Sequence, residues 1–155
     1  MKSGLPAAYN KGPIVSKVIL LGDSGVGKTS VINSFMFKDY KHVTMPTIGA
    51  DFHNAKVKLT DNFDDQINLQ IWDTAGQEQF QSLCRAFYRG SDCVVIVYDV
   101  TNMQSYQNME KWQSRFRDAT KSDDIPIVII GNKADLDVRV NSEMVKTEWI
   151  SEEKA

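Results

Sequence analysis

Residues 22–29 read Gly22-Asp23-Ser24-Gly25-Val26-Gly27-Lys28-Thr29 and fit the pattern G-x-x-x-x-G-K-[ST]. The apolar run 18–21 precedes this stretch, and a segment with the 3.6-residue period of a helix follows it. Glycines allow the backbone N–H groups of such a loop to curl round a phosphate, and the helix N-terminus adds partial positive charge. The strand–loop–helix order therefore predicts a site for a nucleoside triphosphate, which kinases and ATPases also possess.

Two side chains of this stretch have chemistry suited to phosphates. Lys28 can place a positive charge beside the outer phosphates, and the Thr29 hydroxyl can ligate magnesium. We expect the nucleotide to contact the loop and the first helical turn, namely Asp23, Ser24, Gly25, Val26, Gly27, Lys28, Thr29 and Ser30.

Strands and helices alternate on both sides of this loop. The apolar runs 18–21, 94–97 and 127–130 predict parallel strands that are buried on both faces. Three apolar stripes with helical spacing are expected to cover the sheet: Ile32, Phe35 and Met36; Phe80, Leu83 and Phe87; and Tyr106, Met109, Trp112, Phe116 and Ala119. We therefore predict an α/β fold, the three-layer sandwich of P-loop NTPases.

Two further segments, 51–60 and 66–73, alternate between apolar and polar residues, and a hairpin loop is expected at 61–65. They predict one antiparallel edge strand on the otherwise parallel sheet. Phe52 and Trp72 lie on the polar sides of these strands, which indicates either a partner surface or a helix or loop that covers them. His53 is interpreted as a packed side chain and His42 as a solvated loop residue.

A second motif, Asn132-Lys133-Ala134-Asp135, directly follows the apolar run 127–130. Ligands of open α/β sheets bind at the carboxyl ends of the strands, so this loop is placed to contact a nucleotide base. The Asp135 carboxylate can accept hydrogen bonds from N1–H and the 2-amino group of guanine, whereas adenine would leave it unpaired, a difference worth about 10⁴-fold or more. We predict that Asn132, Lys133 and Asp135 bind guanine; the alternative is an asparagine turn with solvated charges.

A third group of residues surrounds the end of the strand 66–73. Asp73 can hold magnesium through water, and Gly76 can donate its N–H to a γ-phosphate. Gln77 can orient an attacking water, and Thr47 can close on the metal from another side. The predicted magnesium ligands are Thr29, Thr47 and Asp73, and the predicted catalytic residues are Gln77, Lys28, Thr47 and Gly76.

The bulk properties are those of one ordinary globular domain. The chain has 155 residues, 42% of them apolar and 25% charged, and its net charge of -2 provides no basic field for nucleic acid. We expect a flexible tail at 1–15 without the apolar core of a signal peptide, and a single domain at 16–155 without a membrane-spanning run. Cys84 and Cys93 are interpreted as reduced core thiols of an intracellular protein.

Together these segments resemble the Ras superfamily of small GTPases from about Lys17 to Trp149, with four of the five guanine-nucleotide motifs of that family. The resemblance implies a monomeric switch that binds GTP and GDP with Mg2+ and hydrolyses GTP. It also implies an exchange factor and a GTPase-activating protein as partners, and it places Tyr40 against the base edge.

The branch resembled is the Rab branch, on the segments 48–52, 69–72, 87–90 and 97–101, and within it the late-endosomal and vacuolar Rab. In that branch an aromatic triad, here Phe52, Trp72 and Phe87, presents the nucleotide state to effectors. The resemblance thus implies a role in vesicle and endosomal membrane traffic, with a cytoplasmic protein that associates with endosomal or vacuolar membranes in its full-length form.

Two departures from the family pattern qualify this expectation. Gln79 stands where the family usually has arginine.

The family continues beyond the position of Ala155 with a strand, a guanine-contacting loop, a helix and a tail with prenylated cysteines, so we expect membrane attachment only in a form that carries those cysteines. Without that strand and helix we expect an open apolar sheet edge at 127–130 and a loss of stability larger than the loss of base contacts. A nucleotide- or partner-binding module with little hydrolysis is therefore the alternative to an active switch.

Overall fold

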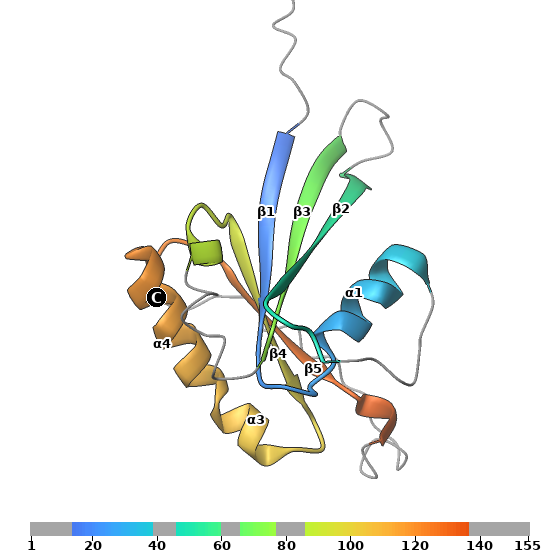
Figure 1. Ribbon diagram of the computed structural model, residues 1–155, viewed down its shortest axis with the longest axis vertical. Helices are drawn as coiled ribbons and strands as arrows, with labels where there is room; N and C mark the ends of the chain where they lie inside the picture. Colours follow the sequence, from blue (N-terminus) through green and yellow to red (C-terminus); the bar gives the residue numbers. More distant parts are fainter. Residues whose placement is uncertain (1–13, 39–45, 60–65, 77–85, 137–155) are drawn as a thin grey trace, which may run out of the picture.

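The computed structural model describes residues 14–38, 46–59, 66–76 and 86–136, which form one twisted sheet with helices on both faces (Figure 1). Five strands are ordered β2-β3-β1-β4-β5. Their bounds are β1 Ile14–Leu21, β2 Ala50–Lys58, β3 Gln66–Thr74, β4 Cys93–Asp99 and β5 Ile127–Asn132. All pairs are parallel except β2 with β3. This arrangement confirms the predicted α/β sheet with one antiparallel edge strand.

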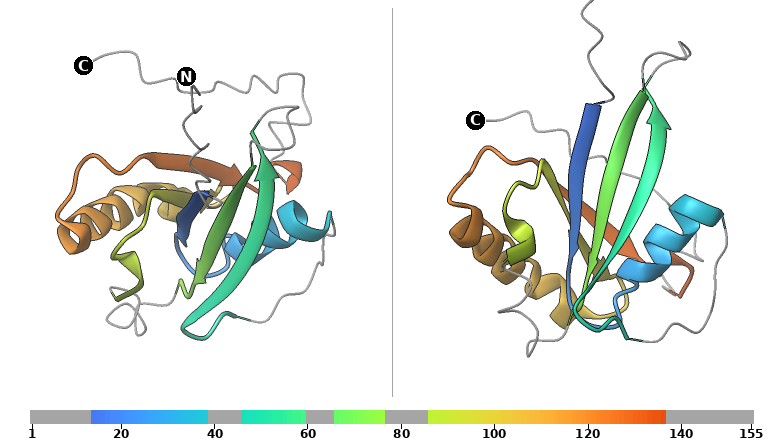
Figure 2. Two further views of the ribbon diagram at one scale, coloured as in Figure 1. Left: turned by 90° about the horizontal axis from the view of Figure 1, so that it is seen from above. Right: turned by 45° about the horizontal axis from the view of Figure 1, so that its top comes forward.

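The helices form the two outer layers. Helix α1 (Lys28–Phe37) lies on one face, and α3 (Met103–Gln107) and α4 (Met109–Thr120) lie on the other, as two views show (Figures 1 and 2). A short 3-10 helix, η2 (Ala134–Leu136), follows β5. The longest of these helices has 12 residues, and within the described ranges none is long and apolar enough to cross a membrane.

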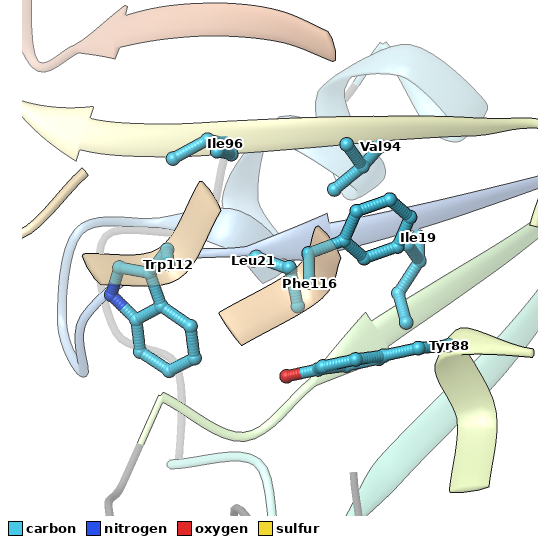
Figure 3. Close-up of a cluster of buried hydrophobic side chains, with 7 residues drawn as sticks. All are labelled: Ile19, Leu21, Tyr88, Val94, Ile96, Trp112 and Phe116. Atoms are coloured by element: carbon cyan, nitrogen blue, oxygen red, sulfur yellow. The ribbon is translucent and has the colours of Figure 1, made fainter. Parts of the chain in front are cut away.

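Each face of the sheet has its own apolar cluster, because successive residues of β1 point to opposite sides. The cluster beneath α4 consists of Ile19, Leu21, Tyr88, Val94, Ile96, Trp112 and Phe116 (Figure 3). The cluster beneath α1 consists of Leu20, Val26, Ile32, Ile71 and Val97. The three predicted layers are thus held by two separate cores that meet at β1 and β4.

Three sequence-based expectations about individual elements are wrong in detail. Strand β1 begins at Ile14, two residues before the expected domain start at residue 16. The apolar stripe of 106–119 is interrupted, because α3 ends and α4 begins around Asn108, and Tyr106 is 51% exposed. Phe35 of α1 is 53% exposed instead of belonging to the core.

Strand β5 also differs from the prediction that it is buried on both faces. Val128 and Ile129 are 45% and 51% exposed. The physical reason is that β5 stands at the edge of the sheet formed by the described residues, with β4 as its neighbour there. Within the described ranges β5 thus forms one edge of the sheet, with Val128 and Ile129 partly exposed.

Candidate nucleotide-binding site

The predicted motifs meet at one edge of the sheet. In the strand registers, Leu20 lies opposite Asp73, Leu21 opposite Ile96, and Asp99 opposite Asn132. The carboxyl ends of β1, β3, β4 and β5 therefore lie next to one another, and the loops that follow them share this edge. Such an edge is where open α/β sheets bind ligands.

The phosphate loop, residues 22–27, joins β1 to α1 in a tight curl. Gly27 is the N-cap of α1, with a φ of 96°, and it offers no side-chain cap to the first-turn N–H groups. The N-terminus of such a helix favours binding of an anion. A Cβ at Gly27 would collide with the side-chain amide of Asn132, so another residue there would strain the backbone and displace that amide.

Lys28 is held against this loop and is only 6% exposed. Its Nζ donates to the carbonyl oxygens of Gly22 and Asp23, at 2.8 Å each. The loop therefore carries a fixed positive charge next to its own N–H groups, as binding of the outer phosphates requires.

The three predicted magnesium ligands lie together. Thr29 Oγ1 donates to Asp73 Oδ2 at 2.5 Å, and Thr47 Oγ1 lies 3.1 Å from Thr29 Oγ1 and 3.3 Å from Asp73 Oδ2. Asp73 is 1% exposed, and its Oδ1 has no hydrogen-bond partner within the described part of the chain. Burial raises the pKa of Asp73, while the hydrogen bond from Thr29, the charge of Lys28 and the hydrogen bond from Thr47 oppose the rise.

This donor set fits a hard divalent cation. Mg²⁺ is commonly held by one or two carboxylates together with hydroxyls, waters and substrate phosphates, and a buried carboxylate oxygen without a partner is a suitable ligand. No cluster of three or more His, Cys, Asp or Glu side chains occurs among the described residues, so an all-protein cage for a metal is not formed by them. One carboxylate with two hydroxyls is the kind of donor set that Mg²⁺ shares with substrate phosphates.

Gly76 lies against the phosphate loop. A Cβ at this position would collide with the peptide that joins Asp23 to Ser24. The preceding residue is tied to the start of β2, since the Ala75 N–H donates to the Gly49 carbonyl at 2.8 Å. Glycine at position 76 thus allows the end of β3 to reach the loop that precedes α1.

The base motif is tied to both the phosphate loop and β4. Asn132 Nδ2 donates to the Val26 carbonyl at 2.8 Å. Lys133 has a φ of 63°, and its Nζ lies 2.7 Å from Asp99 Oδ2. Although burial alone would raise the pKa of Asp99, the hydrogen bonds from Lys133 and Thr101 lower it overall. These contacts hold the loop after β5 beside the phosphate loop.

An open cavity of about 500 Å³ lies where a base would be expected. Its lining residues are Ser30, Val31, Ser34, Phe35, Asn132 and Asp135. Asp135 is exposed and belongs to η2, so its carboxylate is accessible to a ligand. The predicted base-binding residues therefore stand next to an accessible space that continues along α1.

Asp23 has a role that its place in the motif did not indicate. Its carboxylate accepts hydrogen bonds from Asn108 Nδ2 at 2.7 Å and Trp112 Nε1 at 2.8 Å. The side chain is thus engaged by α4, and only its backbone can serve a phosphate. Asn108 and Trp112 were not predicted as site residues; the one available signal is that a buried tryptophan usually needs an acceptor for its N–H.

The aromatic triad is assembled on the surface of the sheet. Phe52 and Trp72 are register partners with ring centroids 5.1 Å apart, and Phe87 lies 5.1 Å from Trp72 on the other side. Phe52 is 41% exposed, whereas the other two rings are half-buried against the core beneath α4. The outer ring thus remains accessible in the described structure, while the inner two also have a packing role.

Lys17 lies beneath this triad. Its Nζ is 5.0 Å from the Trp72 ring centroid and donates to the carbonyls of Phe87 at 2.6 Å and Arg89 at 2.9 Å. Burial lowers the pKa of Lys17, and the charge of Asp92 opposes this shift. One ammonium group thus connects β1, β3 and the segment that carries Phe87.

Several predicted residues lie outside the described residues, namely Gln77, Gln79, Tyr40, His42, Cys84, Phe80 and Leu83, together with the tail up to residue 13 and the loop 61–65. The roles assigned to them stay predictions. His53 is half-buried, as expected for a packed side chain, with its Nε2 3.6 Å from Asp51 Oδ2. Cys93 is half-buried in β4, and burial, followed by the charge of Asp92, raises its thiol pKa.

Comparison with known proteins agrees with this geometry. The Ras family model matches residues 17–154. The chain is 50% identical to Ras-related protein RABG3f of Arabidopsis thaliana over 139 residues, which is 86% of this chain and 66% of that protein. It is 48% identical to Ras-related protein Rab7 of Cenchrus ciliaris over 139 residues, with the same shares of 86% and 66%. With Ras-related protein Rab7 of Drosophila melanogaster it shares 47% identity over 136 residues, 86% of this chain and 64% of that protein. The chain spans about two thirds of the length of these relatives.

Proposed function

The chain belongs to the Ras family and is similar to Rab7 and RABG3 proteins, and on this basis we propose that it is a GTP-binding switch of endosomal or vacuolar membrane traffic. In this proposal the chain binds GTP and GDP, hydrolyses GTP, and recruits effectors while GTP is bound. The endosomal or vacuolar setting rests on the similarity to Rab7-type relatives.

One observation carries the nucleotide part of the proposal. The Asn132 side chain donates to the Val26 carbonyl, so a direct hydrogen bond joins the base motif to the phosphate loop. A guanine nucleotide could therefore place its phosphates along residues 22–27 and its base against Asp135. The accessible Asp135 carboxylate would accept from guanine N1–H and the 2-amino group, and adenine would leave this charge unpaired.

The proposed chemistry is transfer of the γ-phosphoryl group to water. The water oxygen bonds to the γ-phosphorus as the bond to the β–γ bridging oxygen breaks, which yields GDP and phosphate. Lys28 would stabilise the charge on the phosphates, and the Gly76 N–H would donate to the γ-phosphate. Gln77 would orient the water. Mg²⁺, held by Thr29, Thr47 and Asp73, would supply neutralisation of the phosphate charge.

The proposed effector surface is the aromatic triad. Phe52 is its accessible member, and its ring and that of Phe87 contact the Trp72 ring in tilted arrangements. Residues 48–52 lead from Thr47, which lies at the magnesium site, directly into this surface. A change at Thr47 on GTP binding would therefore reach Phe52 through five residues of chain. Exchange of GDP and stimulation of hydrolysis would involve an exchange factor and an activating protein.

The decisive experiment measures bound nucleotide and turnover in the same preparation. Purified protein is denatured and its released nucleotide identified; the proposal expects GDP or GTP in near-stoichiometric amount. Single-turnover release of phosphate from GTP-loaded protein is then compared with that of the Gln77→Leu variant, which has similar volume but lacks donor and acceptor. The intrinsic rate should be on the order of 10⁻⁴ per second and fall in the variant.

Three results separate the possibilities. Absence of guanine nucleotide from the purified chain, with failure to load it, contradicts the proposed function altogether. Bound nucleotide without turnover supports the alternative of a binding module. Equal phosphate release by the parent and by Gln77→Leu at equal GTP loading shows that Gln77 does not position the water.

A further inference from the structure

A polar network connects the phosphate loop to the start of α4. The Asp23 carboxylate accepts from Asn108 Nδ2 at 2.7 Å through Oδ2 and from Trp112 Nε1 at 2.8 Å through Oδ1. These partners are 85 and 89 positions away in the sequence. Both carboxylate oxygens of a residue in the predicted phosphate motif are therefore directed at a helix.

The donors in this network have fixed orientations. The indole nitrogen of Trp112 can only donate, and its ring is 4% exposed within the cluster that also contains Leu21 and Ile96 (Figure 3). The Asn108 Oδ1 accepts from Gln104 Nε2 at 3.2 Å and from Lys111 Nζ at 3.0 Å. The amide nitrogen of Asn108 must therefore be the atom that faces Asp23, and both groups require an acceptor there.

The backbone of the same residue is held from the opposite side. The Asp23 carbonyl accepts from Lys28 Nζ at 2.8 Å. The peptide between Asp23 and Ser24 is also in close approach with Gly76, where a Cβ would collide with it. This peptide therefore lies between α4, which holds the side chain, and the groups that face the outer phosphates.

We propose that Asn108 and Trp112 are positioning residues for the nucleotide, because they hold Asp23 and thereby keep the phosphate loop in its curled, phosphate-binding conformation. The inference rests on the proposed function, and it adds that α4 controls how long a nucleotide stays bound. Without either donor the loop has more conformations available, and a ligand that binds only the curled one is released faster. Hydrogen bonds to a charged acceptor are strong enough for about a tenfold effect on such a rate.

The test measures dissociation of radiolabelled GDP from the full chain, in parallel with thermal unfolding. Trp112→Phe removes the N–H but keeps a buried aromatic ring, and Asn108→Ala removes the second donor from a half-buried site. Each should release GDP about tenfold faster than the parent. Asp23→Ala should accelerate release as well, and adding Trp112→Phe to it should give little further change, because the two side chains act through one contact.

Phe116→Leu is the matched control. Phe116 lies in the same helix and the same cluster as Trp112, is 0% exposed, and belongs to the core without contributing a side-chain hydrogen bond. This variant should unfold at a lower temperature, while its GDP dissociation stays within about twofold of that of the parent.

The outcomes distinguish positioning from general stability. If dissociation follows the unfolding temperature in all variants, so that Phe116→Leu accelerates release as much as Trp112→Phe, the two residues are merely structural and the inference is wrong. If Trp112→Phe does not fold, Asn108→Ala decides alone, and an unchanged rate in that variant overturns the inference. A parent chain that cannot be loaded with GDP overturns the proposed function and this inference together, whereas normal loading with unchanged variant rates overturns only the inference.

Discussion

Replacement of Gly27 by alanine should destabilise the protein by separating the phosphate loop from the base motif. Gly27 has a φ of 96°, and a Cβ built there would collide with the Asn132 side-chain amide. That amide donates to the carbonyl of Val26, a residue that is only 2% exposed. Gly27→Ala therefore strains the backbone and also displaces a partner from the part-buried carbonyl of a core residue.

The magnitude can be worked out with Gly25→Ala as the control. Gly25 also has a positive φ, of 78°, but nothing lies within 4 Å of its added Cβ. Both variants incur about 1–2 kcal/mol of backbone strain, and both gain about 0.4–1 kcal/mol from the stiffer unfolded chain. Gly27→Ala additionally leaves the Val26 carbonyl unsatisfied, at about 1–3 kcal/mol. The difference between the two variants is therefore about 1–3 kcal/mol.

Urea unfolding of both variants measures this difference, with midpoints converted through a common slope. A second comparison repeats the experiment in an Asn132→Ala background, where the colliding amide is absent. There Gly27→Ala should cost no more than Gly25→Ala. Equal free energies of unfolding for Gly27→Ala and Gly25→Ala in the parent background would refute the reasoning, because the contact with Asn132 would then contribute nothing.

Three further predictions follow from the same site and its surroundings. Asp135→Asn should shift binding from guanine toward xanthine nucleotides by about tenfold or more, since an amide donor can face the xanthine carbonyl. Competition between GTP and XTP measures this shift, and an unchanged preference contradicts the base assignment. Phe52→Ala should leave GDP retention unchanged and reduce GTP-dependent capture of partners from a cell extract; loss of GDP binding would show a structural role instead. The pKa of Asp99 is lowered on folding, so its ion pair with Lys133 stabilises the protein above about pH 4 and loses this effect as the pH falls through the lower folded pKa. Asp99→Asn should therefore make the free energy of unfolding less dependent on pH in the acid range. If the urea midpoint of this variant depends on pH in acid just as that of the parent does, the ion pair does not have this role.

Much of the site could be predicted because each motif is a short, contiguous segment. The spacing of Gly22, Gly27 and Lys28 already specifies a loop between a strand and a helix. The alternation in 66–73 placed Asp73 at the end of a strand, and the structure brings it within hydrogen-bond distance of Thr29. Backbone connectivity and the parallel sheet bring the strand ends together, and these are local patterns that sequence alone can reveal.

The parts that sequence reasoning missed depend on contacts between distant segments. The acceptor of the Trp112 N–H could be any polar atom near α4, and nothing in the spacing selects Asp23. One apolar stripe of helical period reveals neither the break between α3 and α4 at Asn108 nor the exposure of Tyr106. Phe35 and Ile129 are exposed although each belongs to an apolar pattern in the sequence, because exposure is decided by which elements cover a face.

The central position of β1 has a consequence for how the chain reaches its folded state. This strand comes early in the chain but pairs in parallel with both β3 and β4, and the contact between Lys17 and Asp92 spans 75 residues of sequence. At a synthesis rate of about 5–20 residues per second, β1 emerges from the ribosome roughly 4–15 seconds before its β4 partner. During that interval its apolar side chains, Ile19, Leu20 and Leu21, have no partner strand on that side. The sheet of this domain can therefore form only late in synthesis, and until β4 has been made we expect the nascent chain to expose apolar residues of β1 that favour aggregation.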